Sequence, residues 1–474
     1  MISRRQFLAT GAATASAAML APTWSPGPVA DEKRRFVLAA ERASLVLLEK
    51  PARVTPVWAY GGSVPGPELR VRRGEAFTVR LENRLSQPTS VHWHGIRIDN
   101  AMDGVAGLTQ DAVPPGGTFD YSFSAPDAGT FWYHPHFRSW EQLARGLYGL
   151  LIVEEDEPPA VDRDVAWIAD DWRLEVTGLI DERSFGSMRD ASHQGRLGNW
   201  LTVNGLTEPQ IPVRAGERIR LRCVNVANAR VMAFDFDRQK LRPSIVAVDG
   251  QPVAPREPDR RGLELAPGQR TDLIVDVLEA PGGRIPVYEV STRERIESAA
   301  FKVEDAPPLR SRPLTESVSL PANPLARDLP LEDAQAIPML MEGGAMGGLG
   351  EASYKGKMLD IRSLVAEGKV WSFNGIVGMP DQPLATVSRG RTAVIDMINR
   401  TAWPHAMHLH GHHFRVVERD GKAVTDAPWR DTVLVARQEK VRIAFIADNP
   451  GKWLFHCHML EHQAAGMVTW IVVA

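Results

Sequence analysis

The sequence predicts an all-β protein made of three consecutive, related β-sandwich domains. Three stretches share an aromatic start, a turn containing proline, and a glycine that precedes an asparagine by nine residues. Apolar and polar residues alternate between these two markers, as at Ile219, Leu221 and Cys223, which indicates half-buried β-strands entered from a glycine turn. Because a recurring pattern is typical of a repeated structural unit, we infer three copies. The stretches are 58–83 (Gly74, Asn83), 200–225 (Gly216, Asn225) and 371–399 (Gly390, Asn399).

Prolines and acidic residues mark the boundaries between the three units. The stretch 154–162 is acidic and contains two prolines, and 306–338 contains seven, which favours an extended linker. We therefore expect domains at 31–155, 160–305 and 339–474, with the linker at 306–338. A chain of 474 residues agrees with about three domains of roughly 150 residues each. Few β-branched residues occur at 140–147, which predicts a short helix there.

The N-terminus has the features of an export signal. Arg4 and Arg5 precede Phe7 and Leu8, and a small-residue apolar stretch follows at 9–21, which looks like a twin-arginine (Tat) signal within residues 1–30. The apolar stretch is shorter than the roughly 20 residues of a membrane span. We expect a protein without a membrane span that the Tat machinery exports to the periplasm. The alternative is a frayed basic terminus.

Composition and charge exclude several classes of protein. Hydrophobic residues make up 44% and charged residues 24% of the chain, values typical of globular proteins and not of disordered ones. The net charge is -3 and the chain has no long run of lysine or arginine, so we expect no nucleic acid as a partner.

Histidines fall at matching positions in the first and third units. A His-x-His pair on a strand is commonly two histidines on one face, so a single pair is weak evidence for a metal. Matched clusters in two units, with the middle unit lacking them, predict one metal site shared by the first and third units. Nine and eleven residues after the asparagine marker, the first unit has His92 and His94, the third has His408 and His410, and the middle unit has Phe234 and Phe236. Five and seven residues after a glycine, the first unit has His134 and His136 (after Gly129), the third has His456 and His458 (after Gly451), and the middle unit has Tyr288 and Val290 (after Gly283).

The middle unit is therefore expected to bind no metal and to act as a spacer. Ten of the thirteen histidines fall in four clusters, which include His405 and His462; His193, His412 and His413 lie outside them and are expected to be ordinary surface or core residues.

The single cysteine among the histidines selects the metal. One thiolate with two histidines and a weak axial methionine is the ligand set of blue copper, and His405, Cys457, His462 and Met467 supply it. A structural zinc site needs more cysteines. The only other cysteine, Cys223, lies in an alternating strand pattern and is expected in the core. If 456–458 is extended, Cys457 points to one face and its two neighbouring histidines to the other, so one strand connects two metal sites.

Four motifs resemble those of the three-domain multicopper oxidases, the family of laccases and bacterial copper-resistance oxidases. They are HWHG at 92–95, HPH at 134–136, HAMHLHG at 405–411 and HCHMLEHQAAGM at 456–467; VNGLTEPQIPVRAGERIRLR and LAPGQRTDLIVD in the middle unit are also similar. The resemblance implies three cupredoxin-like Greek-key β-sandwiches. It also implies four coppers per chain and the coupling of four one-electron oxidations to the reduction of dioxygen to water.

By this resemblance each site residue receives a role. Cys457 carries electrons from the type 1 copper, which it binds with His405, His462 and the axial Met467. The type 2 copper is held by His92 and His408, and the type 3 pair by His94, His134, His136, His410, His456 and His458. Asp103 matches the acidic residue that the family places beside the trinuclear cluster, and it is the candidate catalytic proton relay. Its alternative role is to shape the turn before Gly104. Many bacterial members have a second carboxylate where this chain has Gln463, which puts that branch of the relay in doubt.

The sequence leaves the reductant open between phenolic or other aromatic donors and Cu(I). Met339, Met341 and Met346 supply thioethers that suit Cu(I), but methionine is equally a core filler. Trp403, two residues before His405, mildly favours a flat aromatic donor. The alternative functions are a copper-free scaffold and a periplasmic copper-binding or tolerance protein, and we expect a monomer in each case.

Overall fold

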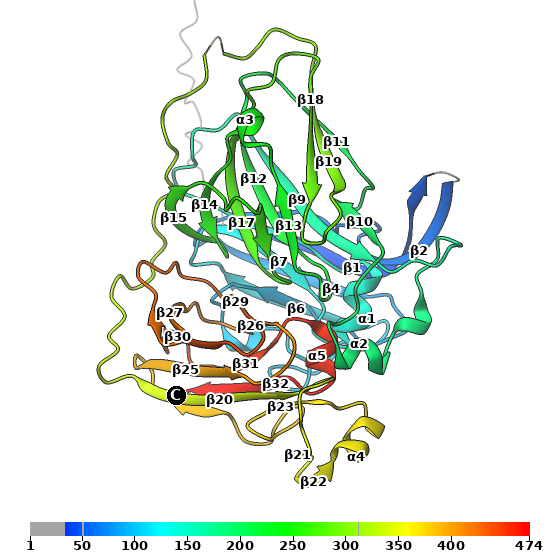
Figure 1. Cartoon of the computed structure of the whole chain (residues 1–474), viewed down its shortest axis with the longest axis vertical. Helices are drawn as coiled ribbons and strands as arrows, with labels where there is room; N and C mark the ends of the chain where they lie inside the picture. Colours follow the sequence, from blue (N-terminus) through cyan, green and yellow to red (C-terminus); the bar gives the residue numbers. More distant parts are fainter. Residues whose placement is uncertain (1–33, 50–51, 311) are drawn as a thin grey trace, which may run out of the picture. The chain divides into compact units, whose positions relative to one another are not determined.

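The fold is described by a computed structural model that covers residues 34–49, 52–310 and 312–474. The predicted Tat signal at 1–30 lies outside the described residues. Most regular structure is β-strand, and Figure 1 shows the strands in groups coloured blue to cyan, green, and yellow to red along the chain. Within the described ranges, no helix has both the length and the apolar character that crossing a bilayer requires.

The first domain consists of two four-stranded sheets around one core. Phe77 and Val79 of one sheet and Tyr133 and Leu151 of the other belong to the same buried cluster. The expected helix near 140–147 appears as two short helical segments at 139–145. In spatial order, one sheet consists of β2 (Ala52–Tyr60), β1 (Arg34–Glu49), β4 (Ala76–Asn83) and β6 (Thr118–Ser124). The other consists of β3 (Leu69–Arg72), β8 (Gly149–Glu154), β7 (Gly129–His134) and β5 (His92–His94). The helical segments are η1 (Asn100–Met102), α1 (Ser139–Gln142) and η2 (Leu143–Arg145).

The middle domain has a six-stranded and a five-stranded sheet. Phe234 and Phe236, at the positions where the other domains carry histidines, pack in its core against Trp167 with ring centroids 5.7 and 5.3 Å apart. In spatial order, the six-stranded sheet consists of β10 (Trp200–Val203), β9 (Arg163–Trp172), β12 (Arg218–Asn225), β17 (Arg270–Asp276), β14 (Ser244–Val248) and β15 (Gln251–Arg256). The five-stranded sheet consists of β11 (Gln210–Val213), β19 (Ile296–Val303), β18 (Arg284–Glu289), β13 (Met232–Asp235) and β16 (Leu263–Leu265). The helices are η3 (Glu182–Ser184), α2 (Met188–Ser192) and α3 (Arg238–Leu241).

The third domain repeats this plan and adds a small hairpin with a helix. Its core includes Met339, Met341 and Cys457. In spatial order, the six-stranded sheet consists of β23 (Trp371–Phe373), β20 (Gln335–Gly343), β25 (Thr392–Asn399), β30 (Lys440–Ile446), β27 (Arg415–Arg419) and β28 (Lys422–Ala423). The five-stranded sheet consists of β24 (Ala385–Val387), β32 (Val468–Val473), β31 (Gly451–Cys457), β26 (His405–Leu409) and β29 (Thr432–Val435). The hairpin consists of β21 (Glu351–Tyr354) and β22 (Lys357–Asp360), and the helices are α4 (Ile361–Ala366) and α5 (Leu460–Ala464).

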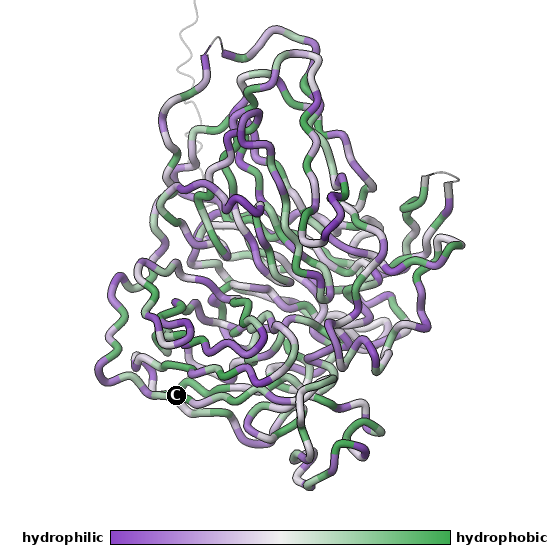
Figure 2. The backbone as a smooth tube through the Cα atoms, viewed as in Figure 1, coloured by the Kyte–Doolittle hydropathy of each residue, from purple (hydrophilic) through white to green (hydrophobic). Residues whose placement is uncertain are grey.

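The three domains share one topology, which confirms the predicted all-β fold of three cupredoxin-like β-sandwiches. The first strand of each domain pairs in parallel with the strand that ends at the asparagine marker: β1 with β4, β9 with β12, and β20 with β25. A second parallel pair joins the opposite sheet of each domain: β3 with β8, β11 with β19, and β24 with β32. In Figure 2 hydrophobic and hydrophilic residues are interspersed along the backbone of the strands.

The asparagine marker has the same structural role in all three domains. Its side-chain oxygen accepts a hydrogen bond from the backbone N–H two residues later, at Leu85, Ala227 and Thr401. Its side-chain nitrogen donates to two carbonyl groups, one shortly before the next strand and one much later in the chain, for example those of Trp403 and Ala436 at Asn399. Each marker therefore fixes the start of the segment that carries the histidines in the first and third domains.

Two details differ from the sequence prediction. The alternation in β12 predicts a half-buried strand, yet β12 is buried on both faces because Arg220 and Arg222 form ion pairs with Asp272 beneath the neighbouring domain. The linker was expected to extend to residue 338, but β20 begins at Gln335. Pro338 is tolerated in this strand because β23 pairs only with 341–343, so the proline faces an unpaired edge.

Candidate metal centres

The predicted histidines of the first and third domains form one buried cluster. In the first domain β5 pairs with β7, which places His92 opposite His134. In the third, β26 pairs with β31, which places His408 opposite His456. The two domains meet through stacked imidazoles, each pair contributing one ring from each domain with centroids 3.8 Å apart: His92 on His410 and His94 on His408. All eight histidines of the cluster are at most 7% exposed: His92, His94, His134, His136, His408, His410, His456 and His458.

The nitrogen atoms of this cluster fit a set of metal ligands. On four rings, those of His92, His134, His408 and His456, the outward nitrogen donates to a backbone carbonyl, as from His92 to Asp103 and from His408 to Asp431, both at 2.9 Å. This hydrogen bond fixes the tautomer and leaves the other nitrogen as a lone-pair donor. Six rings have a buried nitrogen without a hydrogen-bond partner among the described residues: His92 Nε2, His94 Nδ1, His134 Nε2, His136 Nε2, His408 Nε2 and His458 Nε2.

Two further observations support a metal between these rings. His410 Nε2 and His456 Nε2 lie 3.1 Å apart, an approach that suits two lone pairs directed at a shared cation. Burial, together with neighbouring imidazoles, holds the pKa of His134 and His136 well below the usual value, so both rings are neutral. Neutral imidazole is the form that binds metals, and copper is among the metals that it suits.

A second centre contains the sulfur ligand. Cys457 Sγ lies 3.7 Å from His405 Nδ1 and 3.7 Å from His462 Nδ1, and the two nitrogens are 3.1 Å apart. Met467 is buried, and backbone hydrogen bonds hold it next to these residues: its N–H donates to the His462 carbonyl at 2.9 Å and its carbonyl accepts from the Cys457 N–H at 3.1 Å. Burial raises the pKa of the Cys457 thiol to about 12. A thiolate here therefore requires a positive charge in contact with the sulfur, as a bound metal supplies.

The two centres are joined through the tripeptide 456–458. Cys457 belongs to the sulfur centre with His405 and His462, whereas His456 groups with His136 and His410. His458 packs against the rings of the first domain, with its centroid 4.9 Å from that of His94. The strand alternation thus places the cysteine and its neighbours on opposite sides, as the sequence predicts.

Comparison with known proteins identifies the family. Three multicopper oxidase models match residues 46–158, 170–289 and 353–474. Multicopper oxidase MmcO of Mycobacterium tuberculosis is 30% identical, over 98% of this chain and 96% of its own length. This chain belongs to the multicopper oxidases. It is an oxidoreductase with copper as cofactor, and it couples one-electron oxidations of a reductant to the reduction of dioxygen to water. The copper-free scaffold is not favoured.

Solved structures agree with this assignment. The multicopper oxidase of Pseudomonas thermotolerans is 32% identical with a TM-score of 0.80, and the match covers 93% of this chain and 99% of that one. Lac15 from a marine microbial metagenome is 39% identical with a TM-score of 0.74, covering 92% of this chain and all (100%) of the other.

Asp103 of this multicopper oxidase faces the histidine cluster. It follows η1, is 1% exposed, and its carboxylate accepts a hydrogen bond from His410 Nδ1 at 3.0 Å. Its Oδ1 lies 3.2 Å from His92 Nδ1. The side chain thus contacts one histidine from each domain, which a turn-forming role alone does not require. Gln463 is half-buried in α5.

A second carboxylate beside the cluster was missed by the sequence analysis. Asp431 Oδ1 lies 3.1 Å from His94 Nε2, and the Asp431 backbone carbonyl accepts from His408 Nδ1. Burial alone raises the pKa of Asp431, but the charge of Arg270 and hydrogen bonds from the histidines hold that pKa well below its usual value. Neither Asp431 nor Arg270 was matched to a counterpart in the repeat. The only signal was the LAPGQRTDLIVD stretch around Arg270, which served as a mark of resemblance.

The middle domain also reaches the sulfur centre, so it is more than a spacer. His462 Nε2 donates to the carbonyl of His193, which directly follows α2, at 2.8 Å. Glu461 accepts from Asn228 Nδ2 at 2.7 Å and from the Arg196 N–H at 3.0 Å, which attaches α5 to the middle domain. His193, expected to be an ordinary residue, thus covers the outer edge of this centre.

Proposed function

We propose that this multicopper oxidase binds four coppers in the arrangement that the family resemblance implies. The type 1 copper is held by His405, Cys457 and His462, with Met467 axial. The type 2 copper is held by His92 and His408, and the type 3 pair by His94, His134, His136, His410, His456 and His458. The observation that carries this proposal is the convergence of unpartnered, buried imidazole nitrogens beside a sulfur centre on the same strand.

Copper, when bound, supplies one-electron redox chemistry and the site at which dioxygen is reduced. The protein supplies the connection and the protons. Cys457 and its two neighbouring histidines provide a covalent path between the centres. Asp103, through His410 Nδ1 at 3.0 Å, holds a carboxylate where a proton is needed during oxygen reduction.

Metal analysis and spectroscopy test this assignment. We expect about four coppers per chain, a thiolate charge-transfer band from Cys457, and a type 2 signal in electron paramagnetic resonance. A copper-loaded protein that is colourless, or that consumes no oxygen with any reductant, contradicts the proposal.

We further propose that the reductant is a small aromatic molecule that docks next to His193. A cavity of about 780 Å³ is lined by His193, Gln194, Arg189 and Trp403, among others. The rings of His193 and Trp403 lie with centroids 5.3 Å apart, and the His193 carbonyl contacts His462 directly. A flat electron donor that stacks on the rings of His193 and Trp403 would be connected to His462, a proposed type 1 copper ligand, by a single hydrogen bond from His462 to the His193 carbonyl.

The methionines support this choice over Cu(I). Met339 and Met341 are 1% and 0% exposed in the core of the third domain, so they fill space rather than face a ligand. Met346 is 80% exposed, and it is the only one of the three that reaches solvent. Steady-state oxidation of a phenol and of Cu(I) by Trp403→Leu tests the proposal. We expect a higher KM for the phenol with little change for Cu(I); equal effects on both contradict it.

Export and assembly are proposed from the sequence alone. We propose that residues 1–30 direct Tat export to the periplasm, that the domains lie at 31–155, 160–305 and, with the start of the third moved to that of β20, 335–474, and that the enzyme is a monomer. Replacing Arg4 and Arg5 with lysine is expected to retain the protein in the cytoplasm, and cell fractionation measures this. Export of the doubly substituted chain contradicts a Tat signal.

A further inference from the structure

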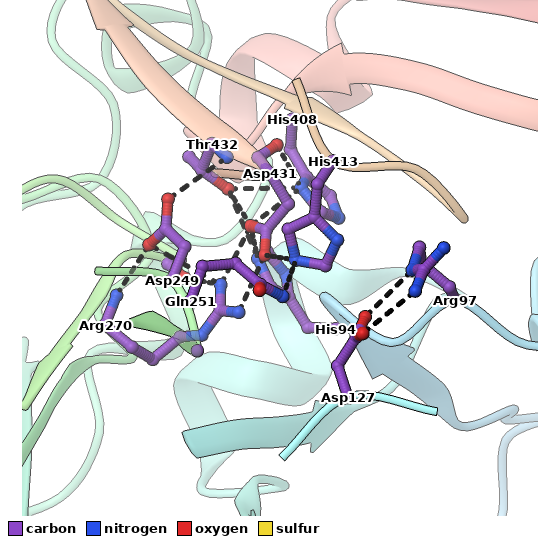
Figure 3. Close-up of polar contacts among 12 residues, drawn as sticks. His94, Arg97, Asp127, Asp249, Gln251, Arg270, His408, His413, Asp431 and Thr432 are labelled. Atoms are coloured by element: carbon purple, nitrogen blue, oxygen red, sulfur yellow. Dashed lines mark hydrogen bonds and ion pairs between the residues drawn. The ribbon is translucent and has the colours of Figure 1, made fainter. Parts of the chain in front are cut away.

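Arg270 of the middle domain forms a fully buried ion pair with Asp431 of the third. Its Nη1 and Nη2 donate to the two carboxylate oxygens at 2.8 and 2.7 Å, and both side chains are 0% exposed. Figure 3 shows the two groups facing one another, with His408 above Asp431 and His94 below it. The pair therefore joins two domains at the point where the histidines of the first and third domains meet.

Asp431 and the following residue hold one imidazole from each of those two domains. Asp431 Oδ1 lies 3.1 Å from His94 Nε2, and its backbone carbonyl accepts from His408 Nδ1 at 2.9 Å. Thr432 Oγ1 donates to Asp431 Oδ1 at 2.8 Å and lies 3.1 Å from His408 Nδ1. The other nitrogen of each ring, His94 Nδ1 and His408 Nε2, is buried and has no hydrogen-bond partner among the described residues.

We propose that Arg270 and Asp431 are positioning residues, through which the middle domain sets the orientation of His94 and His408 and hence the copper affinity of the cluster. This inference rests on the proposed function, because it assumes that these two histidines are ligands. It assigns to the middle domain, which supplies no ligand to the proposed sites, control over one ligand from each of its neighbours.

The guanidinium fork is essential to this role. Besides both oxygens of Asp431, Arg270 donates from Nε to the Thr130 carbonyl of the first domain and from Nη1 to the Gly268 carbonyl, each at 3.2 Å. Its backbone N–H donates to Asp249 Oδ1 at 3.0 Å. A lysine retains the charge but cannot make this planar set of contacts, so the exchange removes orientation without removing charge.

The surrounding backbone leaves no room for the pair to shift. A Cβ atom on Gly268 would lie 3.0 Å from His94 Cε1 and 3.1 Å from His458 Cδ2. On the opposite side, a Cβ on Gly95 would lie 2.5 Å from Asp431 Oδ2. Gly95 thus lets the backbone approach the ion pair closely, and Gly268 lets it approach two of the histidines.

Arg270→Lys tests the inference, with Arg220→Lys as the matched control. Arg220 is also a buried arginine of the middle domain; it pairs with Asp272 at 2.7 Å and with Glu155 of the preceding domain at 2.7 Å, and it contacts none of the proposed ligands. The copper-loaded variants are titrated with a chelator while copper content, the blue band and the type 2 resonance signal are recorded.

We expect Arg270→Lys to lose copper from the trinuclear cluster at 10- to 100-fold lower chelator concentration and to shift the type 2 signal, since losses of this order follow removal of outer-shell partners. The blue band should persist, and Arg220→Lys should behave as the wild type in all three readouts. Equal copper loss in both variants, or an unchanged signal in Arg270→Lys, overturns the inference. A wild-type protein that binds no copper in the cluster instead refutes the proposed function.

Discussion

Replacing Gly95 with alanine should separate the Arg270–Asp431 pair by steric means alone. Gly95 has φ +87°, and a Cβ atom there would overlap with Arg270 Nη2 and lie 2.5 Å from Asp431 Oδ2. Gly390 has nearly the same backbone, with φ +82°, but nothing lies within 4 Å of its Cβ position. The two substitutions therefore share the backbone penalty and differ only in the contact with the ion pair.

The expected magnitudes follow from these two contributions. A non-glycine residue in the left-handed region costs about 1–2 kcal/mol, which applies to both variants. Separating a buried ion pair so that one charge loses its partner costs about 3–5 kcal/mol more, which applies to Gly95→Ala alone. At roughly 2–4 °C per kcal/mol, the Tm of Gly95→Ala should fall about 6–20 °C below that of Gly390→Ala.

Calorimetry of the two variants beside the wild type measures this difference, and copper analysis of the same samples shows whether the cluster is affected. Gly95→Ala should also lose trinuclear copper, whereas Gly390→Ala should not. Equal Tm values for the two variants would mean that the Arg270–Asp431 ion pair accommodates the added Cβ without loss of stability. This result would refute the argument from its packing.

Three further outcomes are expected. Cys457→Ser should abolish the blue band and oxidase activity while the histidine cluster keeps its copper; an optical spectrum with the blue band intact would disprove the sulfur assignment. Asp103→Asn should slow reoxidation by dioxygen at least 10-fold while reduction by substrate stays fast, because only the proton-dependent half of the cycle involves it; stopped-flow measurements at full copper loading separate the two rates, and unchanged reoxidation would mean another proton route. Burial and the neighbouring Asp171 raise the pKa of Asp170 from 3.8 to about 7, so the unfolded chain loses this proton first and stability decreases as pH rises from about 4 to 7. Asp170→Asn should therefore raise the free energy of unfolding at pH 8 by at most about 4 kcal/mol, and with it the Tm, and this gain should vanish near pH 4. A gain in Tm that does not depend on pH would exclude ionisation of Asp170 as its cause.

The repeat made much of this architecture predictable. A residue that recurs at a fixed distance from Asn83, Asn225 or Asn399 occupies the same place in each sandwich, because that side chain fixes the start of the next segment. The pairs His92/His94 and His408/His410 were found in this way, and so was their replacement by phenylalanine in the middle domain.

Contacts between domains were not predictable in this way. Arg220 and Asp431 are charged residues in strands or at strand ends, where a polar residue ordinarily indicates solvent. Both are buried because a neighbouring domain covers them and supplies an opposite charge, from Glu155 to Arg220 and from Arg270 to Asp431. Their partners follow from how the domains pack, which no spacing within one domain encodes. The role of His193 was missed for the same reason, since its backbone carbonyl rather than its ring makes the contact.

The stacked imidazoles, one of each pair from the first domain and one from the third, make metal binding inseparable from the assembly of the chain. A ligand that binds only the assembled state stabilises it by an amount that grows with the logarithm of the ligand concentration over its dissociation constant. Copper bound in the proposed cluster would therefore connect the first domain to the third. Neither domain alone presents a complete cluster, so a partly synthesised chain offers no site at which copper and dioxygen react before the protein has finished folding.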